Sequence, residues 1–386
     1  MTDLLIDEFR PICLTLDRIG PFQESLYSID FTNNDNIPCN FYMLIAPNGF
    51  GKTTILDAIA CAMKLLGEQQ PTEYGLDDID NGNGRIQLDI SVRYRWRGKA
   101  QRIVLSIIAG HFGHDETSLK VWGDEENSLK KAEADSWHRL GYIGSRLSPL
   151  STHKNDGFVN ELLALIQFSQ GLSPDSFNES AIPVPTTLNF SAYRDILPMV
   201  QLSGSQSVAS PEHWGYKTLH QFSAHNETWK HSLDSLLVWL KWLDDGRFEK
   251  AQDLLNQHVF FGTNKVFKGI QRDPPQAIIT INGQQHRLDR LSSGEKNIAQ
   301  LMLRIGSQMT KNTLVLIDEF DVHLHIRWQY QLFDALQALA ARKDAHITVI
   351  LTTHSVEILD TFINRMNIKD EGLVKGGHLI DKGMRA

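Results

Sequence analysis

Apolar positions near the N-terminus follow two different periods. Residues 13–34 alternate between apolar and polar side chains around a Gly-Pro turn, which predicts two strands. The short apolar run Phe41–Pro47 ends at a proline and predicts a buried strand. After Lys52, apolar residues recur at every third or fourth position until Gly67, which predicts a helix with Gly67 as its C-terminal cap. The local order is therefore strand, glycine-containing loop and helix.

The clearest alternation lies in residues 85–98. One face carries the apolar side chains, and the other carries the basic ones: Val92, Tyr94 and Trp96 against Arg93, Arg95 and Arg97. This pattern predicts a half-buried strand that pairs with residues 101–108 in a hairpin. A row of arginines could contact a nucleic-acid backbone. The formal net charge of −8 favours instead a solvated face of the sheet.

The middle of the chain has two regions of different character. Residues 111–185 are rich in turn-forming residues and contain one helical pattern, whereas residues 188–195 predict a return strand. Residues 229–259 are helical in pattern, but the periodicity breaks at Asp244–Gly246, so long heptad arms are not expected. From Ala277 onward the pattern predicts strand, helix, strand and helix.

The composition is that of an ordinary globular protein, with 41% hydrophobic and 22% charged residues among 386. The chain has no uninterrupted apolar stretch of membrane-spanning length, and its first residues are acidic where a signal peptide needs basic ones. These features predict a cytoplasmic protein without a membrane partner. The three cysteines, Cys13, Cys39 and Cys61, lack the spacing of a zinc site and are expected to be small core residues.

The stretch IAPNGFGKTT, Ile45–Thr54, fits the phosphate-binding pattern G-x-x-x-x-G-K-[ST] except for Ala46 at its first position. Its two glycines let successive backbone N–H groups converge on phosphate oxygens. Lys52 would reach the β- and γ-phosphates, and Thr53 would offer a hydroxyl to Mg²⁺. A plain glycine turn before a helix does not explain the Lys-Thr pair. The predicted nucleotide-binding residues are Asn48, Gly49, Gly51, Lys52, Thr53 and Thr54.

A second motif, Leu314–Asp321, joins four apolar residues to carboxylates at the end of the predicted strand. Ligands of open α/β sheets bind at this end of the strands. Asp318 is the expected Mg²⁺ residue, and Glu319 would take a proton from the attacking water. An ordinary acidic strand end would look the same, but the presence of the phosphate-binding pattern favours the catalytic interpretation.

Two further motifs follow the same logic with less specificity. The segment LSSGEK precedes a helical pattern and places Ser292 and Gly294 at a helix N-terminus, where anions bind. Taken by itself, an ordinary helix cap with Glu295 in the first turn explains this segment better. The segment VILTTHS predicts a buried strand that ends at His354. This histidine could hydrogen-bond a γ-phosphate, although a histidine at a strand end is usually structural.

The order of the four motifs resembles that of ABC-type ATPases. The strings LSSGEK, LVLIDEFDVHLHIRWQYQL and VILTTHS are similar to the soluble, non-transporter branch that includes the SMC, RecF and overcoming-lysogenization-defect (OLD-like) families. They resemble most of all a bacterial "predicted ATP-binding protein" group. The similarity is high over residues 287–360 and good over 12–67, and Ser191–Arg194 resembles the aromatic-arginine strand of that group. Ala46 and Ile326 depart from the group, which usually has glycine and proline there.

The resemblance implies an α/β fold built as a P-loop ABC-type head. Such a head has a mixed central sheet with helices on both faces, an antiparallel β subdomain and, in this chain, helical insertions. The whole chain would be a single domain, 1–386. The expected division is a head from about 1–110, 186–200 and 277–386, a loop-rich insertion at 111–185 and a helical insertion at 201–276.

The resemblance also implies a homodimer of heads, or a higher oligomer, that closes around ATP and Mg²⁺. Ser292 and Gly294 would contact the γ-phosphate held by the other copy, and Asp321 would lie at the dimer seam. Glu319 would act as the general base and His354 as a sensor of the γ-phosphate. The expected Mg²⁺ ligands are Thr53 and Asp318.

The moderate spacing between the motifs favours an ATPase that switches another protein. By resemblance, the first hypothesis is an ATPase of a bacterial anti-phage defence module that controls a separately encoded effector, a nuclease or a toxin. The alternative is a RecF-like DNA-repair ATPase that acts directly on DNA, with the arginine row at 93–97 as its contact. A transporter subunit fits least, because the large insertions do not resemble that branch.

Overall fold

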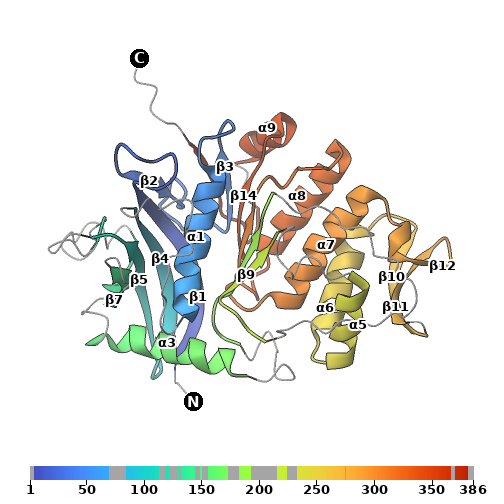
Figure 1. Ribbon diagram of the computed structural model, residues 1–386, viewed down its shortest axis with the longest axis horizontal. Coiled ribbons are helices and arrows are strands. Elements are labelled where there is room, and N and C mark those ends of the chain that lie inside the picture. Colours follow the sequence, from blue (N-terminus) through green and yellow to red (C-terminus); the bar gives the residue numbers. More distant parts are fainter. Residues whose placement is uncertain are drawn as a thin grey trace.

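The computed structural model shows two larger sheets and a smaller one, with helices between and beside them (Figure 1). The described residues are 4–68, 84–112, 118–120, 129, 132–143, 148–149, 155–172, 182–192, 215–223, 233–273, 275–366 and 370–380. Within this part of the chain the fold is α/β, with parallel and antiparallel sheets.

The first sheet has the strand order β2-β1-β4-β5-β6-β7. Its strands are β1 (Leu4–Asp17), β2 (Tyr27–Asp30), β4 (Arg85–Trp96), β5 (Lys99–Gly110), β6 (Ser136–Ile143) and β7 (Ser148–Pro149). The predicted hairpin is confirmed, because β4 and β5 pair antiparallel along their whole lengths. Arg97 and Gly98 both have positive φ in the turn between them, as tight hairpins with right-handed twist require.

The second sheet is parallel throughout, with the order β15-β3-β14-β13-β8-β9. Its strands are β3 (Phe41–Ile45), β8 (Thr187–Phe190), β9 (Leu219–Phe222), β13 (Leu314–Ile317), β14 (Thr348–Thr352) and β15 (Lys375–Leu379). Ile317 pairs with Leu351, and Thr352 pairs with Leu44. The loops that follow β3, β13 and β14 therefore leave the sheet at one edge, which brings the sequence motifs together.

Helices cover both faces of this parallel sheet, as expected. Helix α1 (Lys52–Gly67) lies between the two large sheets, and α3 (Gly157–Gln170) packs against it (Figure 1). The other face carries α7 (Ser293–Gln308), α8 (Ile326–Ala340) and α9 (Val356–Arg365). Alternate residues of the buried strands supply the two cores: Leu316 faces α1, whereas Val315 and Ile317 face α7 and α8.

A smaller unit precedes α7 and lies at the right in Figure 1. It contains α5 (Leu233–Leu243), α6 (Arg247–Leu254), a π-helical turn η3 (Leu255–Val259) and a short 3₁₀ turn η4 (Leu288–Arg290). Its antiparallel sheet consists of β10 (Lys265–Arg272), β11 (Pro275–Ile281) and β12 (Gln284–Arg287). The break between α5 and α6 falls at Gly246, whose φ of 89° suits glycine.

Some strands lie where the sequence pattern predicts turns or helices. β6 lies inside the segment 111–185 and runs parallel to β5, while β9 and β10 lie inside 201–276. β9 is an edge strand of four residues and belongs to the parallel sheet, so the segment 201–276 is not purely helical. The four residues of β9 are too few to show a period, and the pairing of β10 is interrupted by a register shift between Phe267 and Gly269. The division of the chain into a head and insertions stays a prediction.

Gly67 was predicted to cap α1, and this prediction is wrong. Gly67 is the last helical residue, and Glu68 follows it as the cap with an extended backbone. A Cβ atom on Gly67 would lie 2.3 Å from Oγ1 of Thr218 and 2.8 Å from Nε2 of Gln170. Glycine is therefore needed here for close packing against neighbouring segments.

Two predictions can be placed only in part. The return strand is confirmed as β8, which ends at Phe190, whereas Tyr193 and Arg194 of the proposed aromatic-arginine strand lie outside the described residues.

Among the helices that the structure describes, none is long and apolar enough to cross a membrane.

Candidate functional site

The loop after β3 has the backbone of a phosphate-binding loop. Gly49 and Gly51 have φ values of 77° and 93°, the region that favours glycine, whereas Ala46 is not among the residues with positive φ. Ala46 is therefore compatible with the loop. Gly51 is the N-cap of α1 and makes no side-chain cap bond, which leaves the first N–H groups of α1 for an anion. The glycine that the pattern lacks at position 46 is not required by the geometry.

Lys52 begins α1 and folds back over the loop. Its Nζ donates to the carbonyl oxygen of Ala46 over 2.7 Å and to that of Pro47 over 3.2 Å. Burial lowers the pKa of Lys52, while the carboxylates of Glu319, Asp318 and Asp321 act in the opposite direction. The ammonium group thus lies at the loop with carboxylates nearby, in a position from which it can exchange carbonyl partners for phosphate oxygens.

Asp318 joins the ends of three separate elements. Oγ1 of Thr53, in α1, donates to Oδ2 of Asp318 over 2.6 Å, and Oγ1 of Thr352, at the end of β14, donates to Oδ1 over 2.7 Å. Asp318 itself follows β13 and is 3% exposed. A hydroxyl and a carboxylate are the hard oxygen donors that Mg²⁺ prefers. The residues predicted to hold Mg²⁺ are therefore brought together in the folded chain.

The side chain of Glu319 contacts His354. Oε1 of Glu319 is 2.9 Å from Nε2 of His354, and each of the two side chains is about one-third exposed. Glu319 has a φ of 45°, and its N–H donates to Oγ1 of Thr352 over 2.7 Å. A non-glycine residue in this region is strained and often functional. Two predicted catalytic residues thus lie in contact at the rim of the site.

Asp321 is fixed to the same strand end. Its Oδ1 accepts a hydrogen bond from Oγ1 of Thr353 over 2.6 Å and another from the backbone N–H of His354 over 3.3 Å. The segment after β13 is therefore tied to the end of β14 and to the loop after it through Asp318, Glu319 and Asp321.

The segment at Ser292 and Gly294 is positioned by a different set of contacts. Ser292 is the N-cap of α7 and forms a capping box with Glu295. Gly294 is buried against Trp328 of α8, and a Cβ atom at position 294 would lie 2.5 Å from Cδ1 of that ring. Asn297 donates to the carbonyl oxygen of Val322 over 3.4 Å. These contacts hold the segment to α8 and, through Val322, to the loop after β13.

Helix α8 begins at Ile326, where the resembling group usually has proline. Proline is favoured at the first helical position because its fixed φ suits a helix and its missing N–H is not needed there. Ile326 takes that position without a break, and His325 acts as the N-cap, its Nδ1 accepting from the N–H of Arg327 over 3.4 Å. The departure at this position therefore leaves the start of the helix intact.

Sequence reasoning missed several residues at the site. Pro21 and Phe22 pack on the phosphate loop, because a Cβ atom on Gly51 would lie 2.7 Å from each of them. Asp57, in α1, accepts a hydrogen bond from Asn189 of β8 over 3.5 Å. Burial, with a smaller contribution from the charge of Asp318, raises the pKa of Asp57 to about 6 against the effect of that bond. The Gly-Pro turn at residues 20–21 was the one feature of the sequence that pointed to Pro21 and Phe22.

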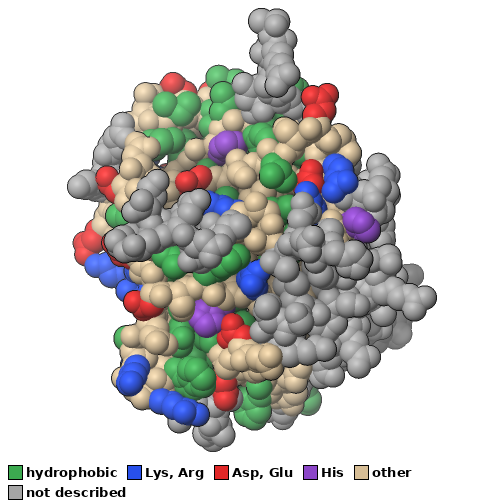
Figure 2. Space-filling model, turned by 90° about the vertical axis from the view of Figure 1, so that its left-hand side faces the viewer, with side chains coloured by type: hydrophobic (Ala, Val, Ile, Leu, Met, Phe, Trp, Pro, Cys, Tyr) green, Lys and Arg blue, Asp and Glu red, His purple; other side chains and the backbone are tan. Residues whose placement is uncertain are grey.

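The arginine row on β4 is paired with acidic side chains of β1. Arg95 contacts Asp7 over 2.9 Å, and Arg93 contacts Glu8 over 3.2 Å. Figure 2 also shows acidic and basic side chains interspersed on one side of the molecule. These pairs fit the interpretation of a solvated sheet face, while direct DNA binding stays a prediction.

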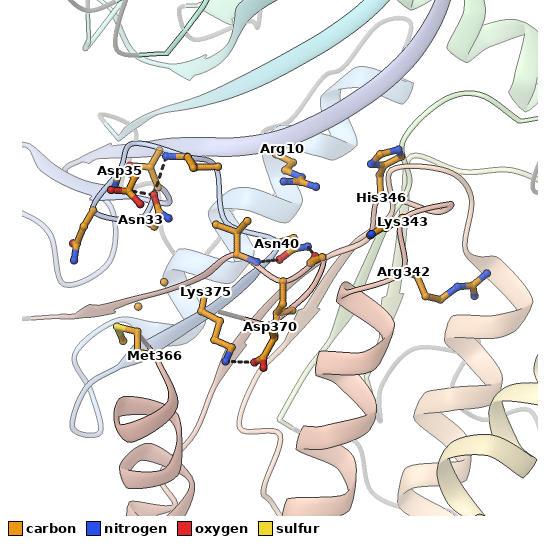
Figure 3. Close-up of a pocket in the computed structure, with 18 residues that line it drawn as sticks. Arg10, Asn33, Asp35, Asn40, Arg342, Lys343, His346, Met366, Asp370 and Lys375 are labelled. Carbon is orange, nitrogen blue, oxygen red and sulfur yellow. Dashed lines mark hydrogen bonds and ion pairs between the residues drawn. The ribbon is translucent and has the colours of Figure 1, made fainter. Parts of the chain in front are cut away.

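A cavity of about 820 Å³ lies at the opposite end of the parallel sheet (Figure 3). Its lining includes Asn40 and Lys375, at the starts of β3 and β15, and none of the predicted site residues. Its basic side chains have acidic partners: Lys375 contacts Asp370, and Lys343 contacts Glu371 over 2.6 Å. The cavity is thus separate from the motifs described above.

Residues 215–360 match the family model described as "AAA domain, putative AbiEii toxin, Type IV TA system". This result agrees with the resemblance read from the motif order, and the matched region includes β13, the start of α7 and the end of β14.

A curated relative is named "Retron Ec83 probable ATPase" and comes from Escherichia coli. The two sequences are 33% identical over 129 residues, which cover 30% of this chain and 22% of the relative. The match thus spans about a fifth of the relative's length.

Solved structures with some similarity include the SMC head domain from Thermotoga maritima, with 13% identity, a TM-score of 0.37 and 91% of each chain covered. Another is an SmcHead bound to the C-terminal winged-helix domain of ScpA, with 11% identity, a TM-score of 0.43 and coverage of 91% and 92%. Both TM-scores lie below 0.5.

Proposed function

We propose that this chain is an Mg²⁺-dependent ATPase that closes as a dimer around ATP and thereby switches a separate effector protein. The observation that carries the ATPase proposal is the group formed by Thr53, Asp318 and Thr352, with Glu319 and His354 in contact beside it. The loop and this group lie where β3, β13 and β14 end.

Binding is assigned to the loop and the start of α1. The N–H groups around Gly49 and Gly51 would donate hydrogen bonds to the phosphate oxygens, and Lys52 would exchange its loop carbonyls for β- and γ-phosphate oxygens. Asn48 and Thr54 would flank the phosphates. Mg²⁺ would be held by Thr53 and Asp318 and would neutralise charge on the phosphates.

Hydrolysis is assigned to Glu319 and His354. A carboxylate one residue after Asp318 can take a proton from a water molecule that attacks the γ-phosphorus. His354 holds Oε1 of Glu319 at 2.9 Å, so it can orient that base and contact the γ-phosphate once ATP is bound. ADP and inorganic phosphate are the products.

Dimerisation is supported by the different contacts that hold the two parts of the site. Ser292 and Gly294 are held by Glu295 and Trp328, while Thr53 is held by Asp318. Because these are different clusters of one chain, we infer that Ser292 and Gly294 meet the γ-phosphate bound by a second copy. Asp321 would then lie at the seam between the two heads.

The effector proposal rests on the names of the similar proteins, one from a retron and one family description that mentions a toxin–antitoxin system. We therefore place it in an anti-phage defence module, where ATP-driven closure would hold or release a nuclease or toxin.

The deciding variant is Glu319→Gln. ATP binding should persist, while hydrolysis should fall by ~10²- to 10⁴-fold, the usual contribution of a positioned base. The matched control is Glu371→Gln, which removes an exposed glutamate at the far end of the sheet. Hydrolysis rates and nucleotide affinity are measured for both proteins. Normal hydrolysis by Glu319→Gln would show that another group is the base.

The same variant tests the switch. With ATP, Glu319→Gln should accumulate as a closed dimer, and the product of a neighbouring effector gene should co-purify with it to a different extent than with the nucleotide-free chain. Equal recovery of the effector in both states, or none in either, would contradict the switch and leave the ATPase assignment intact.

A further inference from the structure

The hydroxyl of Ser292 belongs to a chain of three side chains that ends on another element. Both Oγ and the backbone N of Ser292 donate to Oε2 of Glu295, each over 2.9 Å. The other carboxylate oxygen, Oε1, accepts a hydrogen bond from Nζ of Lys265 over 2.5 Å. Lys265 is the first residue of β10, so the partner of Glu295 comes from the small antiparallel sheet.

The middle member of this chain is a buried carboxylate. The side chain of Glu295 is 4% exposed and that of Lys265 is 19% exposed, whereas Ser292 lies at the surface. Burial alone would raise the pKa of Glu295, but the hydrogen bonds from Lys265 and from Ser292 hold it below its usual value. Glu295 is therefore a charged group at neutral pH, and its charge depends on Lys265 for compensation.

A negative charge at this position matters because of what Ser292 is expected to meet. The γ-phosphate of ATP is anionic, and a bare carboxylate directly behind the serine would repel it. A carboxylate that is neutralised by an ammonium group can still orient the serine while it no longer opposes the phosphate. The serine hydroxyl also carries a single proton, so the contact with Glu295 must loosen when the hydroxyl turns to a phosphate.

We propose that Lys265 and Glu295 are positioning residues for Ser292. Glu295 orients the serine hydroxyl, and Lys265 cancels the negative charge of Glu295 that would repel the γ-phosphate. This inference rests on the proposed function, since it needs ATP presented by a second copy. It also makes the small sheet β10-β11-β12 part of the hydrolytic apparatus, although this sheet lies outside all four sequence motifs.

The experiment compares four variants of the full chain: Lys265→Met, Lys265→Arg, Glu295→Gln and the double variant Lys265→Met/Glu295→Gln. Lys265→Met leaves the charge of Glu295 uncompensated, so kcat for ATP hydrolysis should fall by roughly 10-fold or more. The affinity of the full chain for nucleotide should stay within about 2-fold of the unmodified value, because the phosphate loop is unchanged. Lys265→Arg keeps the charge and should retain most of the activity. The double variant should recover activity to within about 3-fold of the unmodified chain, because an uncharged glutamine needs no cation.

The control is Lys241→Met, which breaks an exposed lysine–glutamate pair with Glu249 in the same unit and should leave kcat unchanged. The inference is overturned if Lys265→Met is as active as the unmodified chain, or if the double variant is no more active than Lys265→Met. If Lys265→Met lowers the unfolding temperature, the double variant is compared with Lys265→Arg instead. A double variant that is folded but inactive, beside an active Lys265→Arg, also overturns the inference.

The proposed function fails in a distinguishable way. An unmodified chain that does not hydrolyse ATP above the rate of Lys52→Ala would overturn both proposals. An unmodified chain that hydrolyses ATP, with all the Lys265 and Glu295 variants equally active, overturns only the positioning role.

Discussion

The loop around Lys52 and the segment around Ser292 are built in contrasting ways. The first is assembled from three distant parts of the chain, because Thr53, Asp318 and Thr352 meet through short hydrogen bonds. The second is organised around the start of one helix, by the capping box of Ser292, by Trp328 packed on Gly294 and by Lys265 bound to Glu295. The first region brings together the groups that are proposed to bind a nucleotide, whereas the second presents one hydroxyl at the surface. This difference is what the proposal of a site shared between two copies would require.

The largest expected effect comes from Lys52→Ala, which removes the ammonium group that contacts the loop carbonyls of Ala46 and Pro47. Because hydrogen bonds to charged groups contribute about 1.5–3 kcal/mol, ATP affinity should fall by roughly 10- to 150-fold, and hydrolysis should be lost. Lys64→Ala, on the exposed side of the same helix, is the matched control. A fluorescent nucleotide titration measures both. Unchanged affinity in Lys52→Ala would remove the phosphate loop from the proposed site.

The second region should respond differently. Ser292→Arg should keep its nucleotide affinity but hydrolyse ATP at least about 10-fold more slowly, since a large cation replaces the hydroxyl. A mixture of Ser292→Arg with Lys52→Ala should regain part of the activity, because a mixed dimer contains one intact pair of halves. Measured rates that stay at the level of the two separate variants would argue against a site shared between copies.

Packing of the second region is tested by Gly294→Ala. The added Cβ meets Trp328 at 2.5 Å, so this variant should lose about 1–3 kcal/mol of unfolding free energy through overpacking. Ser293→Ala, at the exposed neighbouring position, should be close to neutral. Thermal or urea unfolding compares the two. Equal stability would show that α7 and α8 move apart at little cost.

The smallest expected effect is that of Thr352→Val on the first region. The change deletes the hydroxyl that links Asp318 to the N–H of Glu319, and should cost about 1–2 kcal/mol of stability. Thr348→Val on the same strand is a close control, because its buried Oγ1 has no hydrogen-bond partner among the described residues. Removing that hydroxyl should be neutral or stabilising. Similar losses in both variants would mean that the assembly of the first region does not depend on Thr352.

Much of the fold and several residues of the first region could be predicted from the sequence. Alternation, helical spacing and apolar runs predicted β3, α1, β4, β5 and β13. Long periodic segments and strongly apolar runs show clearly which side chains are buried, and so which kind of element forms. The residues at the strand ends were found because a parallel sheet brings its carboxyl ends to one edge. Whether each has the proposed role stays a prediction.

What the sequence could not give depends on contacts between distant segments. β9 and β10 are too short or too irregular to show a period, and Lys265 gave no signal that it would contact Glu295. The capping interpretation of the LSSGEK segment is confirmed as a description of its local structure, and it is compatible with a role in binding phosphate. Gly67 was read as a cap from its place in the sequence, but close packing with Thr218 explains it.

Ala46 has one more consequence, which concerns the unfolded chain. A glycine at this position would sample far more backbone conformations before folding than alanine does, and all but one of them would be lost in the loop. Where the native φ permits it, alanine in place of glycine stabilises a protein by about 0.4–1 kcal/mol through this entropy alone. The departure from the pattern at Ala46 should therefore leave the loop more rigid before any phosphate arrives, so less ordering remains to be done upon binding.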